Sequence, residues 1–167
     1  KHEQPGWRAD LGPIAVIGAG GGSRAVCYGL LDEGASEIRL VNRTREKAEA
    51  IAEDIGGPIQ VLPWEERHDA LDGVATAVNV TSQGMVGQPP LDLCLDQLPK
   101  SALATDIIYT PLETPFLAAA RARGNNTVNG LGMLIHQGPA AWKLWFDITP
   151  TVTDELRQRM ERSILGD

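Results

Sequence analysis

Several features that would point to other protein classes are scarce or missing in this chain of 167 residues. Its two cysteines, Cys27 and Cys94, have no metal-ligand spacing, so we expect neither a disulfide framework nor a metal site. No apolar run approaches a membrane span, and residues 1–13 lack the hydrophobic centre of a signal peptide. The 15 basic residues are outnumbered by 22 acidic ones, which argues against a surface that follows nucleic acid or anionic lipid. These absences predict a cytoplasmic protein with no membrane or nucleic-acid partner.

Glycine is the residue type in excess, with 18 of 167 positions against a usual share of about 7%. The chain is 43% apolar, which is enough for one globular domain with a sizeable core. It is too short for two ordinary domains. We therefore expect the glycines to occupy special backbone positions within a single folded unit.

Short apolar runs alternate along the chain with segments of helical periodicity. Strands are predicted at 14–17, 37–41, 59–62, 74–80, 103–109 and 127–129. Helices are predicted before Gly34, from a Thr44 cap to Ile55, from Thr114 to Arg123, and along two apolar stripes after residue 130. Right-handed crossovers then place helices on both faces of the sheet. The pattern predicts an α/β fold: a Rossmann-like, doubly wound, mainly parallel six-stranded sheet with C-terminal helices.

The turn Gly18-Ala19-Gly20-Gly21-Gly22-Ser23 lies between the first predicted strand and the first predicted helix. Gly18 suits a tight turn, Gly20 lets the backbone approach a pyrophosphate, and the helix N-terminus attracts the negative charge. Ser23 stands where a third glycine or alanine is usual. The alternative is an ordinary glycine turn, but its position inside a βαβ unit favours dinucleotide binding.

The end of the second predicted strand indicates which dinucleotide is bound. An NAD site usually has an acidic residue there for the ribose 2′-hydroxyl, whereas this chain has Asn42-Arg43-Thr44. Arg43 can hold a 2′-phosphate as a planar fork, and Lys47 can do so as a point charge. A solvated, charged helix start is the alternative, and it fits Arg45 and Glu46 best. The pattern favours NADP over NAD.

Five segments taken together carry a more specific signal than any one of them. They are Gly-Ala-Gly-Gly-Gly-Ser-Arg-Ala (18–25), Asn-Arg-Thr (42–44), Asn-Val-Thr-Ser-Gln-Gly-Met (79–85), Asp-Ile-Ile-Tyr-Thr-Pro with a second Thr-Pro (106–115), and Asn-Gly-Leu-Gly-Met-Leu-Ile-His-Gln (129–137). This series closely resembles the C-terminal NADP-binding domain of the shikimate dehydrogenases, over residues 14 to about 147. The resemblance implies the NADP-linked interconversion of shikimate and 3-dehydroshikimate, in the pathway to aromatic amino acids.

The resemblance also implies roles for individual residues. Residues 18–23 hold the pyrophosphate, and the adenosine end is held by Asn42, Arg43, Thr44 and Lys47. The cofactor groove is lined by Thr81 and Ser82, the nicotinamide amide contacts the backbone of Ile107 and Gly130, and Met133 packs near its ring. The substrate is reached by Tyr109 and Gln137. Two residues depart from the pattern: Asn129 replaces a common acid, and Pro139 interrupts the following helix.

The same resemblance raises a question about the start of the chain. Members of this family carry a substrate domain before the cofactor domain, and it supplies a lysine and an aspartate for proton transfer. Because the first predicted strand begins at Ile14, we read 1–13 as a linker remnant, 14–150 as the NADP-binding domain and 151–167 as a C-terminal helix. No residue is then assigned a catalytic role, and we expect the chain alone to be inactive. Its start at Lys1 suggests a processed chain, an internal fragment or a truncated form.

Other readings of the function stay open at this point. They are a non-catalytic NADP-binding regulatory module, a dehydrogenase that also accepts quinate, and a methyltransferase, which usually has an acid after the second strand. The missing substrate domain is the expected protein partner, and a homodimer is open.

Overall fold

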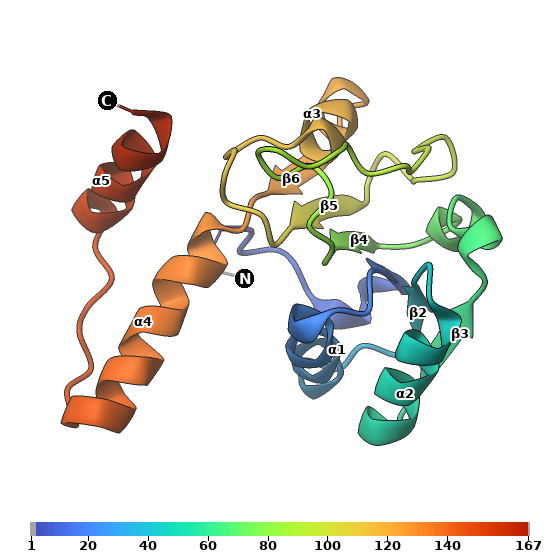
Figure 1. The fold of residues 1–167 in the computed structure, drawn as a ribbon, viewed down its shortest axis with the longest axis horizontal. Coiled ribbons are helices and arrows are strands. Elements are labelled where there is room, and N and C mark those ends of the chain that lie inside the picture. Colours follow the sequence, from blue (N-terminus) through green and yellow to red (C-terminus); the bar gives the residue numbers. More distant parts are fainter. Residues whose placement is uncertain (1–2, 167) are drawn as a thin grey trace.

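The computed structural model describes residues 3–166, and its centre is a six-stranded sheet (Figure 1). The strands are β1 (Ile14–Ile17), β2 (Ile38–Val41), β3 (Ile59–Leu62), β4 (Thr76–Asn79), β5 (Leu103–Asp106) and β6 (Asn126–Val128). Their order is β3-β2-β1-β4-β5-β6, and every pairing is parallel. The predicted doubly wound α/β fold is confirmed, and the strand order reverses between β1 and β4, where ligands of such sheets bind.

Helices cover both faces of the sheet, as the alternation of side chains along β1 shows. Ile14 and Val16 belong to a core cluster with residues of α1 (Gly21–Asp32) and α2 (Arg45–Ile55). Ala15 points the other way, into a cluster with α3 (Pro115–Ala122). Short 3₁₀ turns at Ala9–Leu11, Trp64–Glu66 and Asp69–Leu71 complete the connections. Because strand side chains alternate between faces, a wholly apolar strand such as β1 must be covered on both sides.

Two strands end earlier than the sequence predicted. β4 and β5 were expected at 74–80 and 103–109, but they end at Asn79 and Asp106. In both cases the side chain of the last residue accepts a hydrogen bond from the backbone N–H two residues later, Thr81 and Ile108 respectively. Such local side-chain bonds turn the chain out of the sheet.

The predicted helix caps had different outcomes. Thr114 caps α3, because its hydroxyl accepts from the N–H of Leu117 at 3.3 Å. Thr44 occupies the predicted N-cap position of α2, but its side chain makes no capping hydrogen bond. There the backbone carbonyl of Thr44 accepts instead, from Lys47 N at 3.2 Å and from Asn42 Nδ2 at 2.7 Å.

Two C-terminal helices, α4 (Leu131–Phe146) and α5 (Asp154–Leu165), lie to one side of the sheet (Figure 1). α4 continues through Pro139. The side chain of Thr153 caps α5, which has no buried residue. None of the helices in residues 3–166 is long and apolar enough to cross a membrane.

Candidate functional site

A groove runs along the edge of the sheet where β1, β2, β4 and β5 end. It consists of two cavities of about 440 and 350 Å³ that share Val80, Thr81 and Ser82. The larger cavity is bounded by the glycine turn, the β2–α2 loop and Trp64. The smaller is bounded by the segments that follow β4 and β5. We call the two together the edge groove; it lies at the switch point of the sheet, where open α/β sheets bind ligands.

Gly18 makes the sharp turn at the floor of this groove. Its φ is +115°, and an added Cβ would lie 2.8 Å from Thr81 Cγ2 and 3.1 Å from the backbone of Val80. Its N–H donates to the carbonyl of Val41 at 2.7 Å. Both the backbone angle and the close packing therefore require glycine at this position.

The rest of the glycine turn is held by two side-chain hydrogen bonds, and Gly20 and Gly21 face open space on the other side. Ser23 is fully buried, and its hydroxyl donates to the carbonyl of Gly18 at 2.8 Å, so this side chain supports the turn. Asn42 accepts from the N–H of Ala19 at 3.0 Å and ties the turn to the next loop. Added Cβ atoms at Gly20 and Gly21 would meet nothing within 4 Å. The N–H of Ser23 donates to the carbonyl of Gly20 at 3.1 Å, whereas the N–H groups of Gly21 and Gly22, at the first turn of α1, are of the kind that has no partner within a helix.

Four cationic side chains lie near the end of β2, and in the part of the chain that the structure describes two of them form ion pairs while the other two do not. Arg39 pairs with Glu37 at 2.7 Å, and Arg45 pairs with Glu49 at the same distance. Arg43 and Lys47 are exposed and line the larger cavity, and their side chains form no hydrogen bond or ion pair within residues 3–166. The two cations without a partner are thus the two that face the groove.

Trp64 is a groove residue that the sequence interpretation missed. It follows β3, as Asn42 follows β2, and it lines the larger cavity beside Arg43. The guanidinium of Arg67 lies 4.8 Å from the centre of its ring, and Arg67 is itself held by Asp92 at 2.7 Å. The one sequence feature that could have identified Trp64 is its position just after a strand of a parallel sheet. A tryptophan there also fits a core position, and Trp64 indeed packs partly against buried residues.

Four of the predicted site residues line the smaller cavity: Thr81, Ser82, Ile107 and Tyr109. The hydroxyl of Thr81 donates to Asn79 Oδ1 at 2.7 Å and accepts from Gln83 N at 3.0 Å, which holds the loop in place. Ser82 is exposed, and Tyr109 is 38% exposed. The hydrogen bonds of Thr81 within its own loop therefore fix the polar atoms at this end of the groove.

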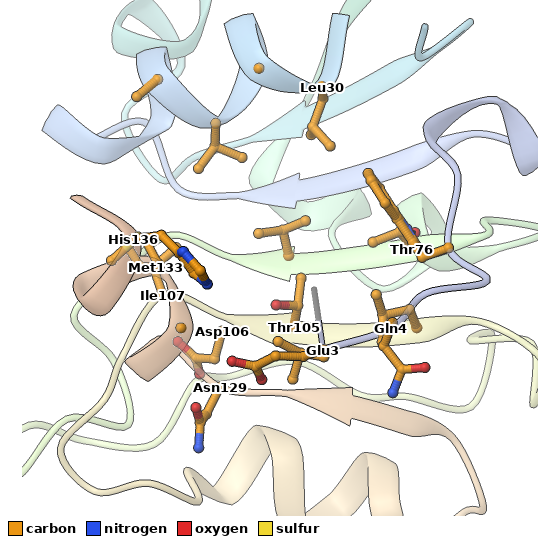
Figure 2. Close-up of a pocket in the computed structure, with 18 residues that line it drawn as sticks. Glu3, Gln4, Leu30, Thr76, Thr105, Asp106, Ile107, Asn129, Met133 and His136 are labelled. Carbon is orange, nitrogen blue, oxygen red and sulfur yellow. The ribbon is translucent and has the colours of Figure 1, made fainter. Parts of the chain in front are cut away.

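Ile107, Gly130 and Met133 also come together. The N–H of Gly130 donates to the carbonyl of Ile108 at 2.8 Å, and an added Cβ would lie 2.1 Å from the carbonyl oxygen of Ile107. Ile107 and Met133 lie at one end of a further, mainly apolar cavity of about 400 Å³ between α1 and α4 (Figure 2). Glycine at 130 is therefore required by the close approach of two backbone segments.

Gln137 lies outside the edge groove, as do Gly130 and Met133. It is exposed on α4, one helical turn after Met133, and it lines none of these three cavities. Its contact with substrate stays a prediction.

The six-stranded parallel sheet, the glycine turn after β1 and the groove at the switch point define a Rossmann-like domain. The profile of the family described as shikimate / quinate 5-dehydrogenase matches residues 9–87. Shikimate dehydrogenase (NADP(+)) of Rhodospirillum rubrum is 52% identical over 161 residues, which cover 94% of this chain and 57% of that protein. The same enzyme of Paracoccus denitrificans is 49% identical, covering 95% and 56%.

Solved structures agree with these sequence matches. Quinate dehydrogenase from Corynebacterium glutamicum, in complex with NAD, superimposes with a TM-score of 0.82 at 29% identity, covering 94% of this chain and 56% of that one. Shikimate 5-dehydrogenase from Thermus thermophilus, in complex with NADP(H) and shikimate, gives 0.74 at 33%, covering 93% and 55%. The chain is thus similar to shikimate dehydrogenases over most of its own length, and it spans slightly more than half the length of these relatives.

Proposed function

We propose that this chain binds NADP in the edge groove and supplies the cofactor half of an enzyme that interconverts shikimate and 3-dehydroshikimate. The observation that carries the cofactor choice is the pair of unpartnered cations, Arg43 and Lys47, at the larger cavity. A 2′-phosphate gives both a partner, whereas NAD leaves both without one. The relatives named for NADP(+) support the same choice.

The bound dinucleotide follows the groove from the β2 end to the β5 end. Its 2′-phosphate meets Arg43 and Lys47, and Trp64 and Thr44 line the adenosine end. Its pyrophosphate lies against Gly18, Ala19 and the start of α1, where the helix N-terminus stabilises negative charge. The nicotinamide occupies the smaller cavity, near the backbone of Ile107 and Gly130, with Ser82 and Tyr109 at its rim. When bound there, NADP supplies hydride transfer to or from the substrate carbon.

Proton transfer is a separate requirement for this reaction. Hydride leaves a hydroxyl-bearing carbon only as the hydroxyl loses its proton, and a positioned acid–base group contributes about 10²–10⁴-fold. Tyr109 is the one titratable side chain that lines the smaller cavity within residues 3–166. We propose that the acid–base groups come from the substrate-binding part of the whole enzyme. The 167 residues alone then bind NADPH without oxidising shikimate.

Calorimetric titration of the chain with NADPH and NADH tests the cofactor assignment. A charge-assisted hydrogen bond contributes about 1.5–3 kcal/mol, so Arg43→Ala should weaken NADPH binding about ten- to a hundredfold and leave NADH binding nearly unchanged. Arg45→Ala is the matched control, because Arg45 is paired with Glu49 and should change neither affinity. Equal losses for both dinucleotides would refute the 2′-phosphate role.

The second half of the proposal is tested by following NADPH formation with saturating shikimate. The chain should show no turnover above background under conditions where the cofactor demonstrably binds. Turnover by the pure chain would show that its own residues carry the proton transfer.

A further inference from the structure

Two buried polar side chains sit next to each other at the ends of neighbouring strands. Asn79 and Asp106 are register partners at the ends of β4 and β5, and they are 0% and 2% exposed. Asn79 Nδ2 donates to Asp106 Oδ2 at 3.0 Å. Burying an amide and a carboxyl group is costly unless both are hydrogen-bonded, so this pair needs an explanation beyond core packing.

Each member of the pair fixes the loop that follows its own strand. Asn79 Oδ1 accepts from the N–H and the hydroxyl of Thr81, at 3.0 and 2.7 Å, and Asn79 Nδ2 also donates to the carbonyl of Gln83 at 3.1 Å. Asp106 Oδ1 accepts from Ile108 N at 2.9 Å, and Oδ2 accepts from the hydroxyl of Thr114 at 2.9 Å. The hydrogen bond between Asn79 and Asp106 therefore joins two backbone segments, 80–85 and 107–114.

The two segments are also packed against each other. Val86 N donates to the carbonyl of Thr110 at 3.3 Å. Gly84 has a φ of +99°, and an added Cβ would lie 3.3 Å from Thr114 Cβ. Together these segments supply every residue that lines the smaller cavity, and they supply none of the glycine turn or the β2–α2 loop.

The electrostatics of Asp106 add a cost that an apolar residue would avoid. Burial raises the pKa of its carboxyl group, and hydrogen bonds from Asn79, Ile108 and Thr114 lower it in part. Well-packed apolar side chains of similar size are often at least as stabilising as such a buried polar pair, whose advantage is a single defined arrangement. The selective value of the pair is then the fixed shape of the loops rather than stability alone.

We propose that Asn79 and Asp106 are positioning residues that hold the nicotinamide end of the edge groove in its binding arrangement. The inference rests on the proposed function, because it assigns that end of the groove to the nicotinamide. Neither side chain lines the smaller cavity, so both act through the loops that do.

Asp106→Asn is the most economical test. An amide has one acceptor oxygen in place of two, so at least one of the three donors around it loses its partner. Affinities are measured for NADPH, for reduced nicotinamide mononucleotide and for adenosine 2′,5′-bisphosphate. We expect about a tenfold loss for NADPH, a loss of similar size for the mononucleotide, and less than about a twofold change for the bisphosphate.

Asn125→Ala is the matched control for lost stability. Asn125 is a buried amide near β6 that donates to the carbonyls of Pro99 and Ala102 at 2.7 and 2.9 Å, and it lines neither cavity of the groove. It should lower the unfolding midpoint and leave all three affinities unchanged. Parallel losses of all three ligands in both variants would show that Asp106 has only a structural role.

Amide hydrogen exchange without ligand gives an independent readout. In Asp106→Asn, exchange should accelerate at residues 81–86 and 107–111 and stay unchanged at 18–24 and 42–47. Uniform acceleration, or none, would overturn the positioning role even if the variant bound its ligands normally. A wild-type chain that bound neither NADPH nor the bisphosphate would refute the proposed function, while the exchange result would still decide whether the pair holds these loops.

Discussion

The sheet and the C-terminal helices differ sharply in how they bury apolar side chains. Ile14, Leu40 and Val41 in the sheet are fully buried, whereas Leu144 and Trp145 near the end of α4 are 84% and 72% exposed. α5 has no buried residue, and its link to the rest of the chain includes an ion pair between Arg157 and Glu3 at 2.5 Å. The edge groove is built entirely by the well-buried part. Cofactor binding should therefore depend on the sheet and hardly at all on residues 140–165.

A pair of leucine truncations should show the largest difference between the two regions. Leu40→Ala removes a fully buried side chain from β2 and should cost about 2–5 kcal/mol of unfolding free energy. Leu144→Ala removes a side chain that is 84% exposed and should change that free energy by less than about 0.5 kcal/mol. Urea denaturation of both variants measures the difference. Similar losses would mean that the end of α4 is packed in solution.

The two free cysteines allow buried and exposed positions to be compared by chemical labelling. Burial raises the pKa of the Cys27 thiol to about 11, so at pH 8 it is almost entirely protonated as well as covered. Cys94 is exposed. A thiol-specific reagent should label Cys94 at once and Cys27 only at the rate of unfolding. Leu40→Ala should accelerate labelling of Cys27, and Leu144→Ala should not; rapid labelling of both thiols in the native chain would contradict the buried core.

Two threonine caps extend the comparison to smaller effects. Thr114→Ala removes the cap of α3 and a buried donor to Asp106, and should cost about 1–3 kcal/mol in the main unfolding transition. Thr153→Ala removes the cap of α5 and should shift that transition by less than about 0.5 kcal/mol, because α5 adds no buried residue to the core. Circular dichroism melts separate the two cases. An equal shift from Thr153→Ala would show that α5 unfolds together with the sheet.

Much of the fold could be predicted because its signals are local. The apolar run of β1, the glycines that end α1 and α2, and the spacing of Ala48, Ile51 and Ile55 each indicate their element without tertiary information. The ends of β4 and β5 could not be predicted in this way. Whether Asn79 and Asp106 continue a strand or bond to their own loops depends on their lying side by side in the folded sheet.

In the candidate site, too, some features could be predicted from local sequence and others needed the folded structure. The glycine turn and Arg43 could be named from the sequence because backbone freedom and charge are properties of the residue and its position. The distinction between Arg43, which has no partner, and Arg45, which is paired with Glu49, needed the structure. Trp64 was missed because a tryptophan after a strand is compatible with both a core position and a groove wall.

Hydrogen exchange of the chain with and without NADPH tests the central claim most directly. The claim is that a dinucleotide binds along the edge groove of the sheet, independently of residues 140–165. NADPH should slow exchange at residues 18–24, 42–47, 80–86 and 107–110 and leave residues 140–165 unchanged. Protection concentrated in residues 140–165, or no protection at the glycine turn, would contradict it.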